Sequence, residues 1–287
     1  MTIEEFRHSL SDSQLTIQLR TWGHPQGEPV LCLHGWLDNV GSYQPLSELG
    51  SQTHRFLAMD FLGHGRSHHL QGRFGYDLFT HCQTLYQLTR DLGIEQFHLV
   101  GHSMGGIVAC LFAGAFSKRL KTLTMIESVG PVAKDEDGLA SRFQKRVEAR
   151  DVWLNRPTRS FAGLDEAAEK WAKVSGLGLD HARMIVSHHL LESPDGSYSW
   201  GYDPLLQLPS LYAFNEDQVK SFLSSVACPV LSIRADGGVF SHYHKKMEQR
   251  LSYFKDVTAV QMEGGHHLHM EMPDRIKSLL EEHLTRA

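Results

Sequence analysis

The chain has 287 residues, of which 41% are hydrophobic and 21% charged, and its formal net charge is −5. These values are ordinary for a globular protein of one large domain, and the lack of a basic surplus argues against a nucleic-acid partner. No apolar run approaches the roughly 20 residues of a membrane span. The segment MTIEEFRHSL also lacks the apolar core of a signal peptide, so we expect a cytoplasmic chain.

Apolar runs in the first half of the chain predict the strands of a sheet. Residues 14–21 alternate apolar and polar, as a half-buried strand does, and residues 3–9 are predicted to pair with them as a hairpin. The continuous apolar runs at 30–33 and 55–59 are typical of buried parallel strands. The elements expected next are a helix at 76–92, a strand at 97–100, a helix to about residue 116 and a strand at 121–126.

The pattern changes between residues 131 and 215. Charged helical stretches appear there, at 138–150, 164–174 and 180–191, and strands resume only at 229–233 and 257–260, before a last helix from about 273. Alternating strands and helices predict an α/β fold, with a mostly parallel twisted sheet and helices on both of its faces. We therefore expect a core made of residues 1–130 and 216–287, with residues 131–215 inserted as a helical lid.

The sequence GHSMGG at residues 101–106 lies between a predicted strand and a predicted helix. A turn this tight leaves no room for a Cβ two residues before or after its apex, so glycine is needed at 101 and 105. The turn would lift the hydroxyl of Ser103 above the sheet. Backbone N–H groups at the start of the helix would point toward whatever Ser103 attacks. These features predict a nucleophilic serine at position 103.

A nucleophilic serine needs a base, and the base needs a carboxylate to fix its tautomer. The histidine is expected in a loop after the last strand, where His266 follows a glycine pair; His267 is the alternative. Two predicted strands between the serine and the histidine end at an acid, namely Glu127 and Asp236. Either side chain could serve the base.

An oxyanion hole needs two backbone N–H groups. The residue after the nucleophile, Met104, supplies the first, and Trp36 in the loop after the strand at 30–33 is predicted to supply the second. The 19 histidines and four scattered cysteines show no zinc-ligand spacing and no C-x-x-C pair. We therefore expect neither a metal nor a cofactor, and no disulfide.

Four motifs in chain order resemble the α/β-hydrolase superfamily. They are LHGW at 33–36, the segment 60–67 (DFLGHGRS), GHSMGG at 101–106, and Gly265-His266 followed by EMP at 271–273. The predicted lid is similar to that of serine-hydrolase-like carboxylesterases. The usual acid of the superfamily lies in a G-x-x-D turn, whereas this chain has Ala235-Asp236-Gly237-Gly238. Other branches carry the acid right after the strand that follows the nucleophile helix, and Glu127 lies there, so Glu127 is favoured over Asp236.

The resemblance implies a cofactor-free carboxylesterase that forms an acyl-enzyme intermediate. The expected partner is a small-molecule ester, apolar and small to medium in size, held against lid aromatics such as Trp153, Phe161 and Trp171. Two alternatives stay open: a carbon–carbon bond hydrolase of diketones with the same three residues, and a ligand-binding member of the fold without turnover. The sequence does not indicate the physiological substrate or the oligomeric state.

Overall fold

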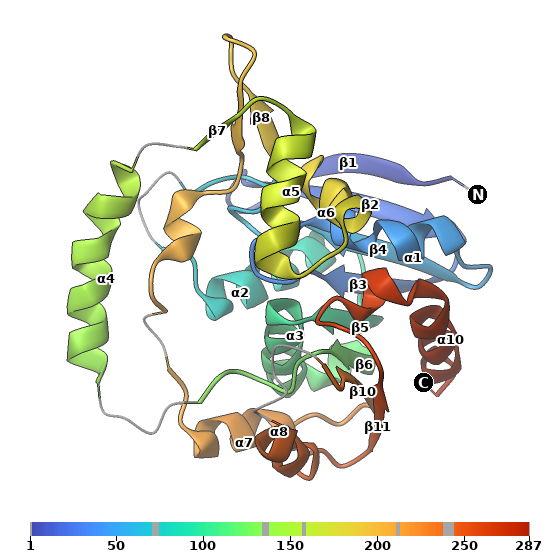
Figure 1. Cartoon of the computed structure of the whole chain (residues 1–287). Helices are drawn as coiled ribbons and strands as arrows, with labels where there is room; N and C mark the ends of the chain where they lie inside the picture. Colours follow the sequence, from blue (N-terminus) through green and yellow to red (C-terminus); the bar gives the residue numbers. More distant parts are fainter. Residues whose placement is uncertain are drawn as a thin grey trace.

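A single mixed sheet of eight strands forms the centre of the molecule (Figure 1), in the order β1-β2-β4-β3-β5-β6-β10-β11. The computed structural model describes residues 2–70, 75–133, 138–156, 159–210, 213–237 and 244–286. The strands are β1 (Glu4–Ser9), β2 (Thr16–Gly23), β3 (Glu28–Leu33), β4 (His54–Met59), β5 (Phe97–His102), β6 (Leu120–Ile126), β10 (Val230–Ala235) and β11 (Val257–Met262).

The pairing of these strands confirms the predicted sheet. β1 and β2 form the expected antiparallel hairpin, and β2 also runs antiparallel to β4. All other neighbours, from β4 through β3, β5, β6 and β10 to β11, are parallel. The carboxyl ends of the parallel strands therefore meet at one edge of the sheet, where the loops after β3, β5, β6, β10 and β11 gather.

Helices cover both faces of the sheet, as predicted. In β3 the alternation of side chains sends Leu31 and Leu33 into one apolar cluster, and Val30 and Cys32 into another. The first cluster includes side chains of α2 (Leu78–Asp91), α3 (Met104–Ala115), α7 (Glu216–Ser224) and α8 (His244–Leu251). The second includes side chains of α1 (Gln44–Leu49), α9 (Leu268–Glu271) and α10 (Pro273–Leu284). Short 3₁₀ turns are η1 (Val40–Tyr43), η2 (Ser117–Arg119) and η3 (Pro204–Gln207).

The described part of the segment between β6 and α7 contains three α-helices and a small sheet. The helices are α4 (Leu139–Leu154), α5 (Leu164–Ser175) and α6 (Leu179–Val186). The strands β7 (Ser160–Phe161), β8 (Leu190–Glu192) and β9 (Tyr198–Trp200) pair in the order β7-β9-β8 and rise at the top of Figure 1. The predicted helix at 180–191 was thus too long, because its last residues form β8. The division into core and lid stays a prediction.

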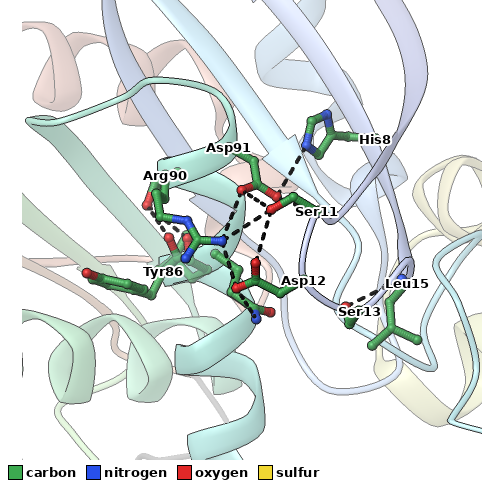
Figure 2. Close-up of polar contacts among 11 residues, drawn as sticks. His8, Ser11, Asp12, Ser13, Leu15, Tyr86, Arg90 and Asp91 are labelled. Carbon is green, nitrogen blue, oxygen red and sulfur yellow. Dashed lines mark hydrogen bonds and ion pairs between the residues drawn. The ribbon is translucent and has the colours of Figure 1, made fainter.

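A polar network ties the tip of the β1–β2 hairpin to the end of α2, as Figure 2 shows. The backbone N–H and the hydroxyl of Ser11 both donate to Asp91, each at 2.8 Å. Arg90 reaches Asp12 in the same turn, with 2.7 Å between Nη2 and Oδ2. The network fixes the outer hairpin against a helix that packs on the sheet.

All four cysteines are buried and free, in agreement with the prediction of no disulfide. Burial also raises the pKa of Cys82, Cys110 and Cys228 to about 12, which keeps these thiols protonated. No helix in the described ranges is long and apolar enough to cross a membrane.

Buried histidines make the stability of this protein sensitive to acid. Burial lowers the pKa to about 3 in His81, His102 and His189, and to about 4 in His34, His188 and His283. Below pH 6.5 the unfolded chain therefore binds more protons at these sites than the folded chain does. The free energy of unfolding consequently decreases as the pH is lowered. Two groups work in the opposite direction, against these six: Asp60, whose pKa burial raises to about 7, and His267, whose pKa Asp38 raises against the effect of burial.

We expect the apparent melting temperature to fall by on the order of 10 °C between pH 7 and pH 5. Circular dichroism melts at one scan rate and constant ionic strength measure this fall. A melting temperature that is constant or rises over that range would contradict the assignment of these histidines as buried and neutral.

Candidate active site

The turn between β5 and α3 has the strained backbone that its sequence predicts. Ser103 has φ 51° and ψ −116°, and its backbone N–H donates to the carbonyl of Ile126 at 2.9 Å. A Cβ on Gly101 would lie 2.4 Å from the carbonyl oxygen of Gly105, and a Cβ on Gly105 would lie 2.1 Å from that of Leu33. The requirement for glycine at both positions is confirmed, and the half-buried Ser103 lies at the apex of the turn.

Glu127 directly follows β6 and is held by the neighbouring strand β10. Its φ is 51°, a left-handed value unusual for glutamate, and its backbone N–H donates to Ile233 at 2.8 Å. Its carboxylate oxygen Oε1 accepts from the backbone N–H of Ala235 at 2.6 Å. The side chain is 2% exposed. These bonds fix one carboxylate oxygen and aim the other out of the sheet edge.

His266 meets that second oxygen. Its Nδ1 lies 3.2 Å from Oε2 of Glu127. Because a carboxylate accepts, the proton of the neutral ring belongs on Nδ1, which leaves the lone pair on Nε2. The carbonyl of His266 accepts from Nε2 of His102 at 2.9 Å, and the two rings lie 4.8 Å apart. Since His102 precedes Ser103, the structure brings Ser103, Glu127 and His266 to one place at the sheet edge.

The two alternative residues have other partners. Asp236 is exposed, and its Oδ1 accepts from the backbone N–H of Gly264 at 3.3 Å, two residues before His266. The other glycine quoted with its turn, Gly238, lies outside the described residues. His267 turns to Asp38, with 3.3 Å between Nε2 and Oδ2. The structure thus pairs His266 with Glu127, whereas Asp236 supports the loop and His267 joins a different carboxylate.

The loop after β3 lies against the start of α3. The close approach of Gly105 to Leu33 places it there, and Met104 begins the helix, where backbone N–H groups have no partner within the helix. Trp36 in this loop is 51% exposed, and its indole N–H donates to the carbonyl of Leu206 in η3 at 3.1 Å. That bond links the predicted oxyanion loop to the predicted lid. The roles of Trp36 and Met104 in an oxyanion hole stay a prediction.

His34 shapes the same loop. Its Nε2 accepts from the backbone N–H of Phe61 at 3.0 Å, and its Nδ1 donates to the carbonyl of Gly35 at 2.7 Å. Burial lowers the pKa of His34 to about 4, so both bonds involve a neutral ring. The imidazole therefore connects the loops after β3 and β4 and orients the backbone beside Trp36.

The sequence did not predict that Asp38 and three histidines form a buried cluster next to His266. Asp38 lies 3.3 Å from Nε2 of His267 and 3.6 Å from Nδ1 of His102, and the ring of His269 lies 4.3 Å from that of His102. Burial alone would raise the pKa of the Asp38 carboxyl, but His267 and His102 outweigh burial and hold it well below its usual range. Burial opposes the charged form of His267, yet Asp38 prevails and raises its pKa. The histidine-rich motifs at 102 and 266–269 were the available signal.

The three predicted lid aromatics have different surroundings. Trp153 lines a hollow of about 230 Å³ together with Arg156, Arg159, Trp200, Tyr202, Pro204 and Gln207. Phe161 is 2% exposed and belongs to a small apolar cluster with Ala167 and Val186, against which Trp171 packs. A second hollow of about 480 Å³ is lined by Leu78, Ile107, Pro131, Val132, Arg142, Lys145, Pro209, Ser210, Ala213 and Phe214. Ile107 lies one helical turn after Ser103.

An eight-stranded, mostly parallel sheet with a strained serine turn and an adjacent acid–histidine pair defines the class of α/β hydrolases. The sequence matches the alpha/beta hydrolase fold family over residues 28–271, and the chain belongs to this family. It is 26% identical to a serine hydrolase-like protein of Danio rerio, covering 98% of this chain and 88% of that protein. It is also 26% identical to serine hydrolase-like protein 2 of Homo sapiens, covering 93% and 90%.

Solved structures agree with this fold. A hypothetical protein from Pseudomonas aeruginosa PAO1 superposes with a TM-score of 0.87 at 31% identity, over 97% of both chains. The thioesterase domain from the curacin biosynthetic pathway superposes with a TM-score of 0.83 at 22% identity, covering 98% of this chain and 100% of that domain. The second likeness concerns the fold alone. The chain is thus a hydrolase of the α/β-hydrolase family.

Proposed function

We propose that this protein is a serine hydrolase that cleaves carboxylic esters, with Ser103, Glu127 and His266 as its catalytic residues. The observation that carries the proposal is the 3.2 Å contact between His266 and Glu127 beside a serine held at φ 51°. The relatives of this chain that are named serine hydrolase-like proteins support the same reaction class. A glutamate that bonds both the base and a buried backbone N–H is a rigid orienting group.

The geometry suggests how each group acts. Ser103 attacks the ester carbonyl while Nε2 of His266 takes its proton, and Glu127 stabilises the imidazolium that forms. The backbone N–H groups of Trp36 and Met104 stabilise the negative charge on the carbonyl oxygen. His266 then gives the proton to the leaving alcohol and activates a water molecule, which hydrolyses the acyl-enzyme at Ser103.

The substrate would be apolar and of small to medium size. Ile107 lies on the half-buried side of α3 near the nucleophile, and it lines hollows with apolar groups such as Val132 and Phe214. Apolar walls with few polar groups suit an acyl or alkyl chain. The bond from Trp36 to Leu206 would let the lid control the shape of this space.

A panel of p-nitrophenyl esters with acyl chains from two to twelve carbons tests the proposal. We expect saturable hydrolysis with an optimum at short or medium chains, together with covalent labelling of Ser103 by a fluorophosphonate. Labelling without hydrolysis of any ester would favour another acyl substrate or a diketone. Neither labelling nor hydrolysis would favour a ligand-binding protein without turnover.

Trp153 should affect which ester is preferred more than how fast the smallest ester reacts. Replacing Trp153 with alanine removes one of the two tryptophans that line its hollow, so we expect the optimum to move toward longer acyl chains. The neighbouring variant Val152→Ala is the matched control, because Val152 is on the same helix and 67% exposed. Chain-length profiles of kcat/KM that coincide for both variants and the wild type would exclude Trp153 from the substrate pocket.

A further inference from the structure

Asp38, His102 and His267, which are buried next to the loop that carries His266, are arranged like the ligands of a metal site. The ligand atoms of Asp38, His102 and His267 all lie within 4.8 Å of one another, and all three residues are buried. Oδ2 of Asp38 is 3.6 Å from Nδ1 of His102 and 3.3 Å from Nε2 of His267. Two ligands of a tetrahedral Zn²⁺, bound at about 2.0–2.1 Å, lie about 3.4 Å apart. Both measured separations are close to that value.

The tautomer of His102 leaves an acceptor without a donor. Its Nε2 is 2.9 Å from the carbonyl of His266, which can only accept, so the proton of the neutral ring is on Nε2. Nδ1 then presents a lone pair toward a carboxylate, and within the described ranges it has no hydrogen-bond partner. A cation between these atoms would satisfy both, and its binding would release to solvent the proton that Asp38 favours on His267. A metal-bound histidine whose other N–H donates to a backbone carbonyl is the usual arrangement of such ligands.

Space for the ion is provided by Gly35. A Cβ on this residue would lie 2.8 Å from Oδ2 of Asp38 and 3.0 Å from Nδ1 of His102, so an alanine would crowd both ligand atoms. In addition, neither ring nitrogen of His269 has a hydrogen-bond partner among the described residues, although the residue is fully buried. The cluster as a whole thus contains more polar atoms than the chain itself satisfies.

We propose that Asp38, His102 and His267 form a binding site for a divalent transition-metal ion of the Zn²⁺ class. The site would adjoin the proposed catalytic base, because His267 follows His266 in the chain and His102 donates to the carbonyl of His266. The binding does not depend on the proposed esterase function.

A second group of three ligand-type residues provides the matched control. Glu28, His54 and His98 also lie within 4.8 Å of one another. There, however, the carboxylate of Glu28 already bonds Lys121, and Nδ1 of His98 is 2.9 Å from the hydroxyl of Thr122. This group has no orphaned acceptor facing a carboxylate, so the substitution His54→Gln should leave metal binding unchanged.

Equilibrium dialysis of the full chain against ZnCl₂ tests the site directly. We expect one Zn²⁺ per chain, with affinity lowered at least ~100-fold in Asp38→Asn and His102→Gln and unchanged in His54→Gln. Gly35→Ala should weaken binding without removing a ligand. Failure to bind one ion per chain, equal binding by all variants, or loss of binding in His54→Gln would overturn the proposal.

One further measurement remains decisive if a variant fails to fold. A crystal of the wild-type chain soaked in Zn²⁺ should show an anomalous peak between the three side chains, and a peak elsewhere would refute the site. Absence of any esterase activity would refute the proposed function, while the dialysis and the soaked crystal would still decide the site.

Discussion

Replacing Ser103 with alanine is expected to lower ester hydrolysis by ~10⁴-fold or more while the protein stays folded. The side chain lost is a single hydroxyl on a half-buried residue, whereas the fold at this turn depends on glycines 101 and 105 and on the bond from the Ser103 N–H to Ile126. Alanine keeps that backbone bond. Initial rates on the best ester of the panel, measured beside a thermal melt, separate loss of the nucleophile from loss of structure.

Ser128 offers a matched control for this experiment. Ser128 is buried and lies near the same turn, since a Cβ added to Gly106 would be 2.6 Å from the Cβ of Ser128. The substitution Ser128→Ala removes a hydroxyl of the same size, and activity should stay within about threefold of the wild type. A rate in Ser103→Ala above about a tenth of the wild-type rate would show that Ser103 is not the nucleophile. A loss of activity in Ser128→Ala larger than the loss in Ser103→Ala would show the same.

The strands of the central sheet could be predicted because they carry strong local signals. Buried parallel strands such as β3 and β5 are continuous apolar runs that end at glycine or a polar residue, and the structure extends each run by only two residues, at one of its ends. The small sheet could not be found in this way. β7 has two residues, and β8 and β9 have three each, which is too short for any periodicity. The predicted helix over 180–191 overran for the same reason.

The serine turn could be predicted because its constraint is local. A Cβ at 101 or 105 would clash with backbone only a few residues away or in the next strand, so the glycines appear in the sequence as a motif. The choice between His266 and His267 depends instead on where two distant carboxylates lie. Asp38 belongs to the loop after β3 and Glu127 to the end of β6, and adjacent ring side chains turn to opposite partners. Spacing along the chain does not contain that information.

The buried cluster shows the same limit more clearly. In the sequence, His102 stands out only as part of the serine motif. The structure places the ring of His102 against Asp38 and the rings of both His102 and His269 near His267. These side chains meet because β5 ends, and the loop after β11 begins, at the same edge of the sheet. Such a group is assembled from loops whose order in space is set by the strand order of the sheet. The sequence alone gives the residue types, but it does not show that their side chains lie close together in the fold.

Replacing Glu127 with glutamine is expected to lower kcat by up to ~10⁴-fold, the effect of an amide in place of the orienting acid. The backbone N–H of Ala235 needs an acceptor in this buried place, so the amide oxygen should take over the bond now made by Oε1. The NH₂ group would then face Nδ1 of His266, at the position where Oε2 now accepts. Facing a donor, Nδ1 becomes the acceptor, the proton moves to Nε2, and the ring no longer accepts a proton from Ser103.

Asp236→Asn is the matched amide substitution at the other acid. The oxygen of asparagine still accepts from the N–H of Gly264, and the residue is exposed, so we expect kcat within about threefold of the wild type. Steady-state rates on one short ester, measured for both variants at pH 7.5, give the comparison, and thermal melts verify folding. If kcat were strongly reduced in Asp236→Asn and close to the wild-type value in Glu127→Gln, then Asp236 would be the residue that orients His266 during catalysis. The 3.2 Å contact of Glu127 with His266 would then be structural.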